Sequence, residues 1–202
     1  MRTFDELRAV ARFSEGLGAP WWIAGGWAID CWLGTVSREH EDIEISVLRR
    51  DQAHLYAYCG DWPRFTPRDD VWVPMQPGEE LVFPEFQVQV RPPATDVAMY
   101  LGLPDEFEFM LNNVESDEWI FRPEPTIRRA WHLLRLPAPG DLWVTAPEAV
   151  LLHKGRHHRP KDEQDFAVAL PRMSSEQRAW LRASLAQIRP ADPWLAVLDA
   201  AG

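Results

Sequence analysis

The most constraining feature of the sequence is a short segment in which an apolar run meets a pair of glycines. Residues 21–24 read Trp-Trp-Ile-Ala, and Gly25 and Gly26 follow them directly. A helix-compatible stretch over residues 27–33 then ends at Gly34, a residue type that commonly closes helices. This order predicts a strand, a glycine turn and a helix as one structural unit.

A second constraint is the alternation of polar and apolar residues over 42–47, which read Asp-Ile-Glu-Ile-Ser-Val. A period of two is typical of a half-buried strand, so Asp42, Glu44 and Ser46 are expected to share one face. The Cα atoms of the two acids then lie roughly 6.6 Å apart. Like charges at short range repel each other. A divalent metal removes that cost, and Mg²⁺ is commonly held by one or two carboxylates together with substrate phosphates.

The glycine pair supplies a candidate phosphate site beside these acids. Residues without a Cβ let backbone N–H groups approach an anion closely, and the helix that begins near Trp27 directs its positive end to the same place. Taken alone, Gly25-Gly26 also fits a tight turn, and Asp-x-Glu also fits a solvated strand face. Their combination, in this order and with a helix between them, favours adjoining phosphate and metal sites.

The remaining pattern predicts an α/β lobe, residues 1–140, and a C-terminal helical lobe, residues 141–202. Twelve of the eighteen prolines lie between residues 62 and 139, so this middle part is expected to be loop-rich. We expect helices from the Thr3–Glu6 capping box to Gly16, over 51–59, from Pro147, over 161–170 and from Ser174, and strands over 86–90 and 107–111. In the last of these strands Glu108 points away from the core that Phe107 and Phe109 enter.

Composition excludes several classes of protein. The 202 residues carry 31 acidic and 21 basic side chains, a formal charge of −10, which makes a protein that grips long nucleic acids by their phosphates unlikely. There are two cysteines, and the N-terminus lacks the apolar stretch of a secretory signal, so we expect a cytoplasmic protein. No window approaches eighteen uninterrupted apolar residues, so no membrane span is predicted.

One segment resembles a known family. The run Trp22-Ile-Ala-Gly-Gly-Trp-Ala-Ile-Asp30, followed by Leu-Gly, Ser-Arg-x-His and Asp-Ile-Glu up to residue 44, is similar to the signature of the aminoglycoside and lincosamide nucleotidyltransferases. These are members of the polymerase-β-like nucleotidyltransferase superfamily. The resemblance is strong over residues 21–47 and thinner over 148–154 and 161–166. It implies an α+β fold with a mixed β-sheet flanked by helices, followed by a small helical lobe.

The resemblance also implies an activity and its cofactors. Such enzymes transfer a nucleoside monophosphate, usually AMP from ATP, to a hydroxyl of a small molecule and release pyrophosphate, with two Mg²⁺ ions. The first two metal-binding acids of the family fall on Asp42 and Glu44, where the family more often has Asp at both positions. The third falls on Glu108, which would also accept the proton of the acceptor hydroxyl. Its rivals are Glu85, Asp96 and Asp105.

Further residues are assigned to the nucleotide. Gly25 and Gly26 would hold the β- and γ-phosphates, and Trp27 would line the cleft as an aromatic wall. Ser37 and Arg38 precede the acidic strand, where a hydroxyl and a guanidinium could help to neutralise the triphosphate. The alternative for Arg38 is a surface ion pair with a neighbouring glutamate, Glu39 or Glu41.

Several polar residues of the second half have competing interpretations. Lys154, carried over from a similar lysine in the family, would lie near the leaving phosphates, and its alternative is an ordinary helix-surface lysine. Lys161, Asp162 and Asp165 are expected to tie the C-terminal helices together. Asp30 is expected to contact the loop that follows its helix. A zinc site at His153 and His157 is disfavoured, because Lys154 stands where a zinc protease motif carries glutamate.

The leading hypothesis is therefore an Mg²⁺-dependent adenylyltransferase that acts on a small hydroxylated molecule such as an aminoglycoside- or lincosamide-like antibiotic. One alternative is a nucleotidyltransferase that modifies a protein or tRNA. Another is a nucleotide-binding descendant in which glutamates at the metal positions mark lost turnover. The sequence leaves the acceptor, the nucleotide preference and the oligomeric state open.

Overall fold

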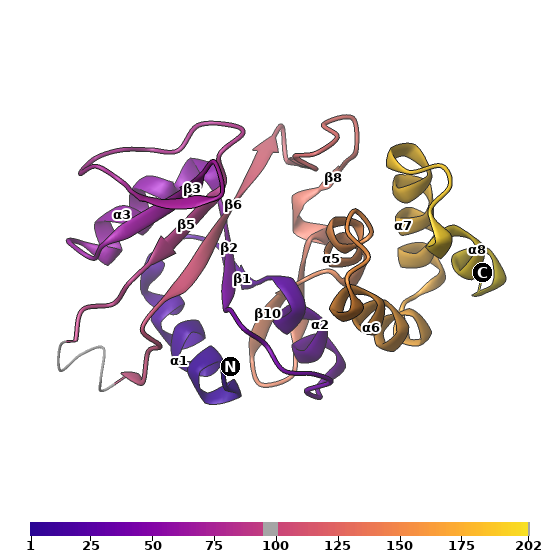
Figure 1. The fold of residues 1–202 in the computed structure, drawn as a ribbon, viewed down its shortest axis with the longest axis horizontal. Coiled ribbons are helices and arrows are strands. Elements are labelled where there is room, and N and C mark those ends of the chain that lie inside the picture. The colour runs from indigo at the N-terminus through magenta and orange to yellow at the C-terminus, as the bar shows by residue number, and fades with distance from the viewer. Residues whose placement is uncertain (95–100, 202) are drawn as a thin grey trace.

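The computed structural model describes residues 1–94 and 101–201, which form one mixed β-sheet flanked by helices (Figure 1). The described helices are α1 (Phe4–Ser14), α2 (Gly25–Leu33), α3 (Gln52–Cys59), α5 (Pro147–Lys154), α6 (Pro160–Ala169), α7 (Ser175–Ile188) and α8 (Pro193–Ala201). The strands are β1 (Trp21–Ile23), β2 (Glu44–Leu48), β3 (Arg64–Arg68), β4 (Val71–Pro74), β5 (Gln87–Val90), β6 (Phe107–Glu115), β7 (Glu118–Ile120), β8 (Arg128–Ala130), β9 (Arg135–Ala138) and β10 (Leu142–Thr145).

The main path through the sheet runs β4-β3-β5-β6-β2-β1-β10-β9, and β7 pairs with both β6 and β8. Two pairs are parallel, β2 with β6 and β1 with β10, and the other pairs are antiparallel. In Figure 1 α1 and α3 lie toward one end of the molecule, whereas the helices from α5 to α8 gather at the other end. Helix α2 packs against α5 and α6 and so joins the two parts.

The burial pattern along the central strands shows that one face of the sheet is apolar. Phe107 and Phe109 of β6 are 1% and 0% exposed, whereas Glu108 between them is half-buried on the opposite face. Ile45 and Val47 of β2 are buried as well. The predicted orientation of Glu108 is therefore confirmed, because alternate side chains of a strand point to opposite faces.

Local signals fixed the helix ends where the sequence predicted them. Thr3 forms a capping box with Glu6 at the start of α1, and Ser174 forms one with Gln177 at the start of α7. Pro147 and Pro160 occupy the first turns of α5 and α6. These residues act locally. Capping side chains accept hydrogen bonds from the free backbone N–H groups at a helix start. Proline has no backbone N–H, and at the first helical position that N–H would have no partner within the helix.

Two predicted boundaries were wrong by a few residues. Helix α2 begins at Gly25, so the two glycines form its first turn and do not precede it. Strand β2 begins at Glu44, and Asp42 lies two residues before the strand and is exposed. The alternating pattern continues to Asp42, but sheet pairing on β2 starts only at Glu44, whose partners are in β6.

Several strands were not predicted: β3, β4, β7, β8 and β9 in the proline-rich middle, and β10 just after it. Prolines lie within β3 and β9, at Pro67 and Pro137. Pro67 pairs only with Trp72 of β4, beyond the part of β3 that meets β5, and β9 is the last strand of the main path. Proline is tolerated where one side of a strand needs no donor, so the prolines of β3 and β9 concealed these two strands.

The predicted division after residue 140 stays a prediction. Strand β10 pairs with β1, and the helical part begins at Pro147. None of the described helices is long and apolar enough to cross a membrane.

We expect Phe109→Ala to lower the free energy of unfolding by about 3–5 kcal/mol, because the substitution leaves a cavity in the centre of the sheet. Urea denaturation followed by tryptophan fluorescence measures this loss. Val71→Ala on β4 is the control, since Val71 is 62% exposed, and it should change stability by less than about 0.5 kcal/mol. Equal effects of the two substitutions would contradict the placement of the core.

Candidate active site

Two carboxylates meet on adjacent parallel strands. Glu44 of β2 and Glu108 of β6 are register partners, so their side chains leave the same face of the sheet side by side. Ser46 follows on this face, paired with Met110. Asp42 lies just before β2, so all three predicted metal-binding acids fall at one end of this strand pair.

Electrostatics at this pair disfavour the charged forms. Burial, followed by the negative charges of Asp42 and Glu108, raises the pKa of Glu44 to about 7. Burial likewise raises the pKa of Glu108 to about 7; Asp42 and Glu106 contribute, whereas a hydrogen bond from Gln87 opposes the shift. That bond runs from Gln87 Nε2 to Glu108 Oε2 over 2.6 Å. A cation placed among these oxygens would favour the charged forms again.

The first turn of α2 approaches Glu44 closely. The φ of Gly25 is +59°, and a Cβ built there would lie 1.6 Å from Glu44 Oε2. A Cβ at Gly26 would lie 1.9 Å from the Nη2 atom of Arg38. The two glycines thus make room for side chains of the protein itself. Phosphate binding by their N–H groups stays a prediction.

A cavity of about 270 Å³ opens beside Glu44, between the sheet and α5. Gly25 and Lys154 also line it, so the structure brings these two predicted residues to one cavity. The other predicted residues are not among its walls. The cavity is completed by Ala24, Ser46, Phe86, Met110, Leu111, Asn112, Asn113, Trp119, Ile120, Arg122, Leu134, Thr145, Ala149, Val150, His153, Arg156, His157 and Arg159.

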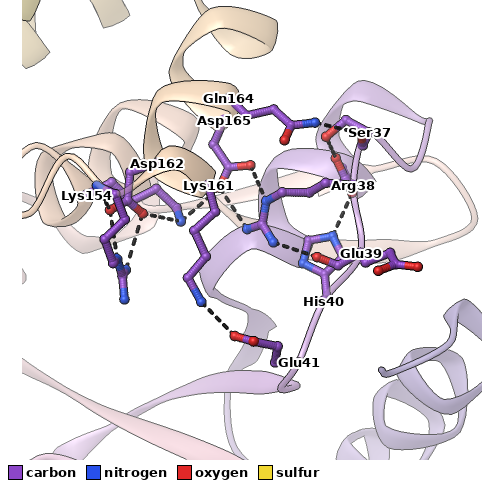
Figure 2. A network of polar contacts seen from close by, with 12 residues as sticks. Ser37, Arg38, Glu39, His40, Glu41, Lys154, Lys161, Asp162, Gln164 and Asp165 are labelled. Carbon is purple, nitrogen blue, oxygen red and sulfur yellow. Dashed lines mark hydrogen bonds and ion pairs between the residues drawn. The ribbon is translucent and has the colours of Figure 1, made fainter.

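Arg38 and Lys154 are held by buried carboxylates of α6 (Figure 2). Arg38 donates from Nε and Nη2 to the two oxygens of Asp165 over 2.8 and 2.9 Å. Lys154 Nζ lies 2.8 Å from Asp165 Oδ2 and 3.1 Å from Asp162 Oδ1. Lys154 is only 7% exposed, so the alternative of an ordinary surface lysine is wrong. Arg38 pairs with Asp165, so the alternative of an ion pair with Glu39 or Glu41 is wrong as well.

The predicted tie between the C-terminal helices is confirmed for Asp162 and Asp165 and wrong for Lys161, which reaches a different element. Asp162 and Asp165 join α6 to Lys154 of α5, and Asp165 also reaches Arg38 in the connection between α2 and β2. Lys161 Nζ pairs with Glu41 of that same connection over 3.0 Å. The loop before the acidic strand is thus fixed to the helical part (Figure 2).

A second polar group holds the loop from inside. Asp30 accepts hydrogen bonds from Ser37 Oγ over 2.6 Å and shares a 2.7 Å contact with His40 Nε2. The expected contact of Asp30 with the following loop is confirmed. The His40 ring stacks on Trp27, with ring centroids 4.0 Å apart, and Trp27 is 3% exposed. Trp27 therefore packs in the core and does not line the cavity, and the Ser37 hydroxyl is directed to Asp30.

The rival third acids lie in other settings. Asp105 is exposed and pairs with Arg2 over 2.6 Å, and Glu85 pairs with Arg68 over 2.8 Å. Asp96 lies outside the described residues. Of the described candidates, Glu108 alone is the register partner of Glu44.

The donor set fits a partly hydrated magnesium ion more closely than an all-protein cage. In residues 1–94 and 101–201 no group of three or more His, Cys, Asp or Glu side chains is arranged to hold a metal ion. Mg²⁺, however, keeps several waters and uses one or two carboxylates with substrate phosphates. Glu44 and Glu108 offer such hard oxygens on one face, at a point where burial and mutual repulsion favour a cation.

The basic lining of the cavity was largely missed from the sequence. Arg156 and Arg159 lie in the run Gly-Arg-His-His-Arg after α5, which is visible as a basic helix end. Arg122 gave no signal, because it is one arginine in a proline-rich segment. Its place in the cavity follows from the pairing of β7 with β6.

Comparison with known proteins agrees with the N-terminal motif. Residues 6–60 match the profile of a family described as aminoglycoside-2''-adenylyltransferase. A 2''-aminoglycoside nucleotidyltransferase of Escherichia coli is 59% identical over 40 residues, which are 20% of this chain and 23% of that protein, and one of Klebsiella pneumoniae matches equally. The chain thus matches about a quarter of the length of these curated relatives.

Solved structures with a similar fold cover most of the chain. The solution structure of the antibiotic-resistance factor ANT(2'')-Ia superposes with a TM-score of 0.58 at 15% identity, covering 92% of this chain and 91% of that one. The lincomycin-bound crystal structure of the lincosamide antibiotic adenylyltransferase LnuA gives 0.55 at 17% identity, covering 82% and 94%. The chain has the fold of these nucleotidyltransferases, as its sequence motif predicted.

We expect Gly26→Ala to lower the free energy of unfolding by about 2–3 kcal/mol, although alanine is the better helix former. The added Cβ would displace Arg38 from Asp165 and leave a buried carboxylate short of a partner. Thermal and urea denaturation measure the loss. In an Arg38→Ala background the same substitution should cost less than about 1 kcal/mol, and an undiminished cost there would contradict the explanation.

The raised pKa values of Glu44 and Glu108 predict a pH-dependent stability in EDTA. Between about pH 4.5 and 7 the folded state binds more protons than the unfolded state, so the free energy of unfolding falls as pH rises through this window. Because both side chains are half-buried, we expect a loss of about 1 kcal/mol after solvent screening. Denaturation at pH 5 and 7.5 measures it, and Glu44→Gln should flatten the dependence.

Proposed function

We propose that this protein is an Mg²⁺-dependent nucleotidyltransferase that transfers AMP from ATP to a hydroxyl of an aminoglycoside- or lincosamide-like antibiotic. The observation that carries the proposal is that Glu44 and Glu108 are register partners on adjacent strands, next to the first turn of α2 and a cavity lined by basic residues. The family profile over residues 6–60 and the printed activities of the relatives support it. The matches include nucleotidyltransferases of antibiotics, which favours a small acceptor over protein or tRNA.

The nucleotide would occupy the cavity with its phosphates near α2. Gly25, in the first turn of α2, and Lys154 both line the cavity, and helix-start N–H groups and an ammonium both suit an anion. Asp42, Glu44 and Glu108 would hold Mg²⁺ together with the phosphate oxygens. When bound, such an ion supplies charge stabilisation to the attacking and departing oxygens of the α-phosphate.

The residues of the chain would then position the acceptor hydroxyl. Its oxygen forms a bond to the α-phosphorus as the bond to the bridging oxygen of the β-phosphate breaks, and pyrophosphate leaves. Glu108 would accept the hydroxyl proton as a general base, because a bound cation favours its charged form. Gln87 Nε2 binds one oxygen of this carboxylate and leaves the other for the proton.

Arg38 and Asp165 would serve this site indirectly. Asp165 fixes Lys154 at the cavity wall and Arg38 beneath Gly26, and so sets the distance between α2, α5 and the acidic strand. Catalysis of this type depends on positioning and charge stabilisation. The buried ion pairs therefore support the site without touching the nucleotide.

The direct test incubates the purified protein with ATP, Mg²⁺ and a panel of aminoglycosides, lincosamides, tRNA and a protein lysate. Pyrophosphate release and product mass are followed. An antibiotic heavier by one AMP supports the proposal. A labelled macromolecule, or nucleotide binding without pyrophosphate release against every acceptor, would overturn it.

We expect Asp42→Asn to reduce transfer by at least about 10³-fold, because one of the three carboxylates that hold the ion is lost. Initial rates of pyrophosphate release measure the effect, and circular dichroism checks the fold. Asp105→Asn is the matched control, since Asp105 is an exposed carboxylate paired with Arg2 outside the site. Full activity of Asp42→Asn would refute the assignment.

A further inference from the structure

The charge of the cavity walls is unbalanced. Among its lining residues four carry a permanent positive charge, Arg122, Lys154, Arg156 and Arg159, whereas Glu44 is the single carboxylate. The chain as a whole is strongly acidic, with a formal charge of −10. A concentration of cations in a concave region of such a protein selects for anions locally, because low-dielectric walls focus the field.

Two of these cations already have counter-ions in the protein. Lys154 pairs with Asp162 and Asp165, and Arg159 Nε lies 2.9 Å from Asp162 Oδ2. Their positive charge is therefore largely offset within the helical part. Neither can account for a strong demand for an external anion.

Arg122 and Arg156 have no such partner. In the described part of the chain neither guanidinium makes an ion pair or a side-chain hydrogen bond with the protein. Arg122 lies over the ring of Phe86, 3.9 Å from its centroid, and Phe86 is itself a wall of the cavity. This contact holds the guanidinium against a wall of the cavity, where its N–H groups can bind a ligand.

The two arginines also repel each other. Burial, followed by the charges of Arg156 and Arg49, lowers the pKa of Arg122. Of the cations around it, Arg49 is occupied by the carbonyl of Leu81 and by Asn113 Oδ1. Arg122 is half-buried and Arg156 is exposed at the cavity mouth, so a ligand of opposite charge could reach both and offset their repulsion.

We propose that Arg122 and Arg156 form an anion subsite that binds the terminal phosphates of a polyphosphate. This inference rests on the proposed function, because the terminal phosphates are taken to be the β- and γ-phosphates of ATP, which leave as pyrophosphate. Arginine forks match phosphate oxygens in pairs, and the two residues come from different elements, the segment after β7 and the segment after α5. The subsite therefore bridges the sheet and the helical part.

The subsite has a consequence for the acceptor. A polycationic antibiotic would meet the unpaired charges of Arg122 and Arg156 if it entered through this cavity. The acceptor must then approach from the side of Asp42 and Glu108, which are not among the cavity walls. The negatively charged nucleotide and the positively charged acceptor would therefore bind on opposite sides of Glu44.

The test measures binding of inorganic pyrophosphate in EDTA by isothermal titration calorimetry, which needs no metal and no transfer. The probes are pyrophosphate, ATP and adenosine, against the full chain and the variants Arg122→Gln and Arg156→Gln. Each variant should weaken pyrophosphate binding about tenfold, because a charge-assisted hydrogen bond is lost. The affinity for adenosine should stay unchanged. Arg172→Gln, an exposed arginine outside the cavity, should bind like the wild type.

Other outcomes overturn the subsite. Wild-type protein that does not bind pyrophosphate, or a double variant that binds it within twofold of the wild type, excludes it. An equal loss of adenosine affinity would show that the arginines support the nucleoside or the fold. Arg122→Lys and Arg156→Lys keep the charge and should retain part of the affinity even where the glutamine variants fold poorly. Pyrophosphate binding through the arginines without AMP transfer would leave the subsite standing and refute the proposed function.

Discussion

The parallel pairing of β2 with β6 is the constraint on which the candidate site depends. It makes Glu44 and Glu108 register partners although they lie 64 positions apart in the chain. Two half-buried carboxylates in this arrangement oppose each other's ionisation, and the apolar residues that alternate with them bury the other face of the same strands. The packing that stabilises the sheet therefore also maintains the electrostatic strain that a bound cation would relieve.

The helical part is joined to this sheet by charged groups that are largely buried. Asp165 is fully buried and receives both Arg38 and Lys154. Burying such ions is expensive, and their attraction repays the cost only when the geometry is good and the remaining hydrogen bonds are satisfied. The arrangement favours one relative position of α2, α5 and α6, which is what a site assembled from all three elements requires.

Local signals in the sequence predicted much of this structure. Capping boxes and prolines located α1, α5, α6 and α7, and alternation placed Glu108 on the polar face of β6. The motif around Gly25 and Asp42 indicated the correct fold. Long-range partners could not be read in this way: Arg38 and Asp165 are 127 residues apart, and no local pattern distinguishes this pair from a surface arginine and a helix aspartate. Trp27 illustrates the same limit, because stacking on His40 depends on the path of a loop.

The two ends of the main sheet path have a further consequence. Among the described residues the path ends in β4 and β9, and β4 finishes at Pro74 whereas β9 contains Pro137. A proline lacks the backbone N–H that an incoming strand would use, so both borders are poor templates for another chain. Pro137, which conceals β9 from sequence inspection, thus also disfavours pairing of another chain with that border of the sheet.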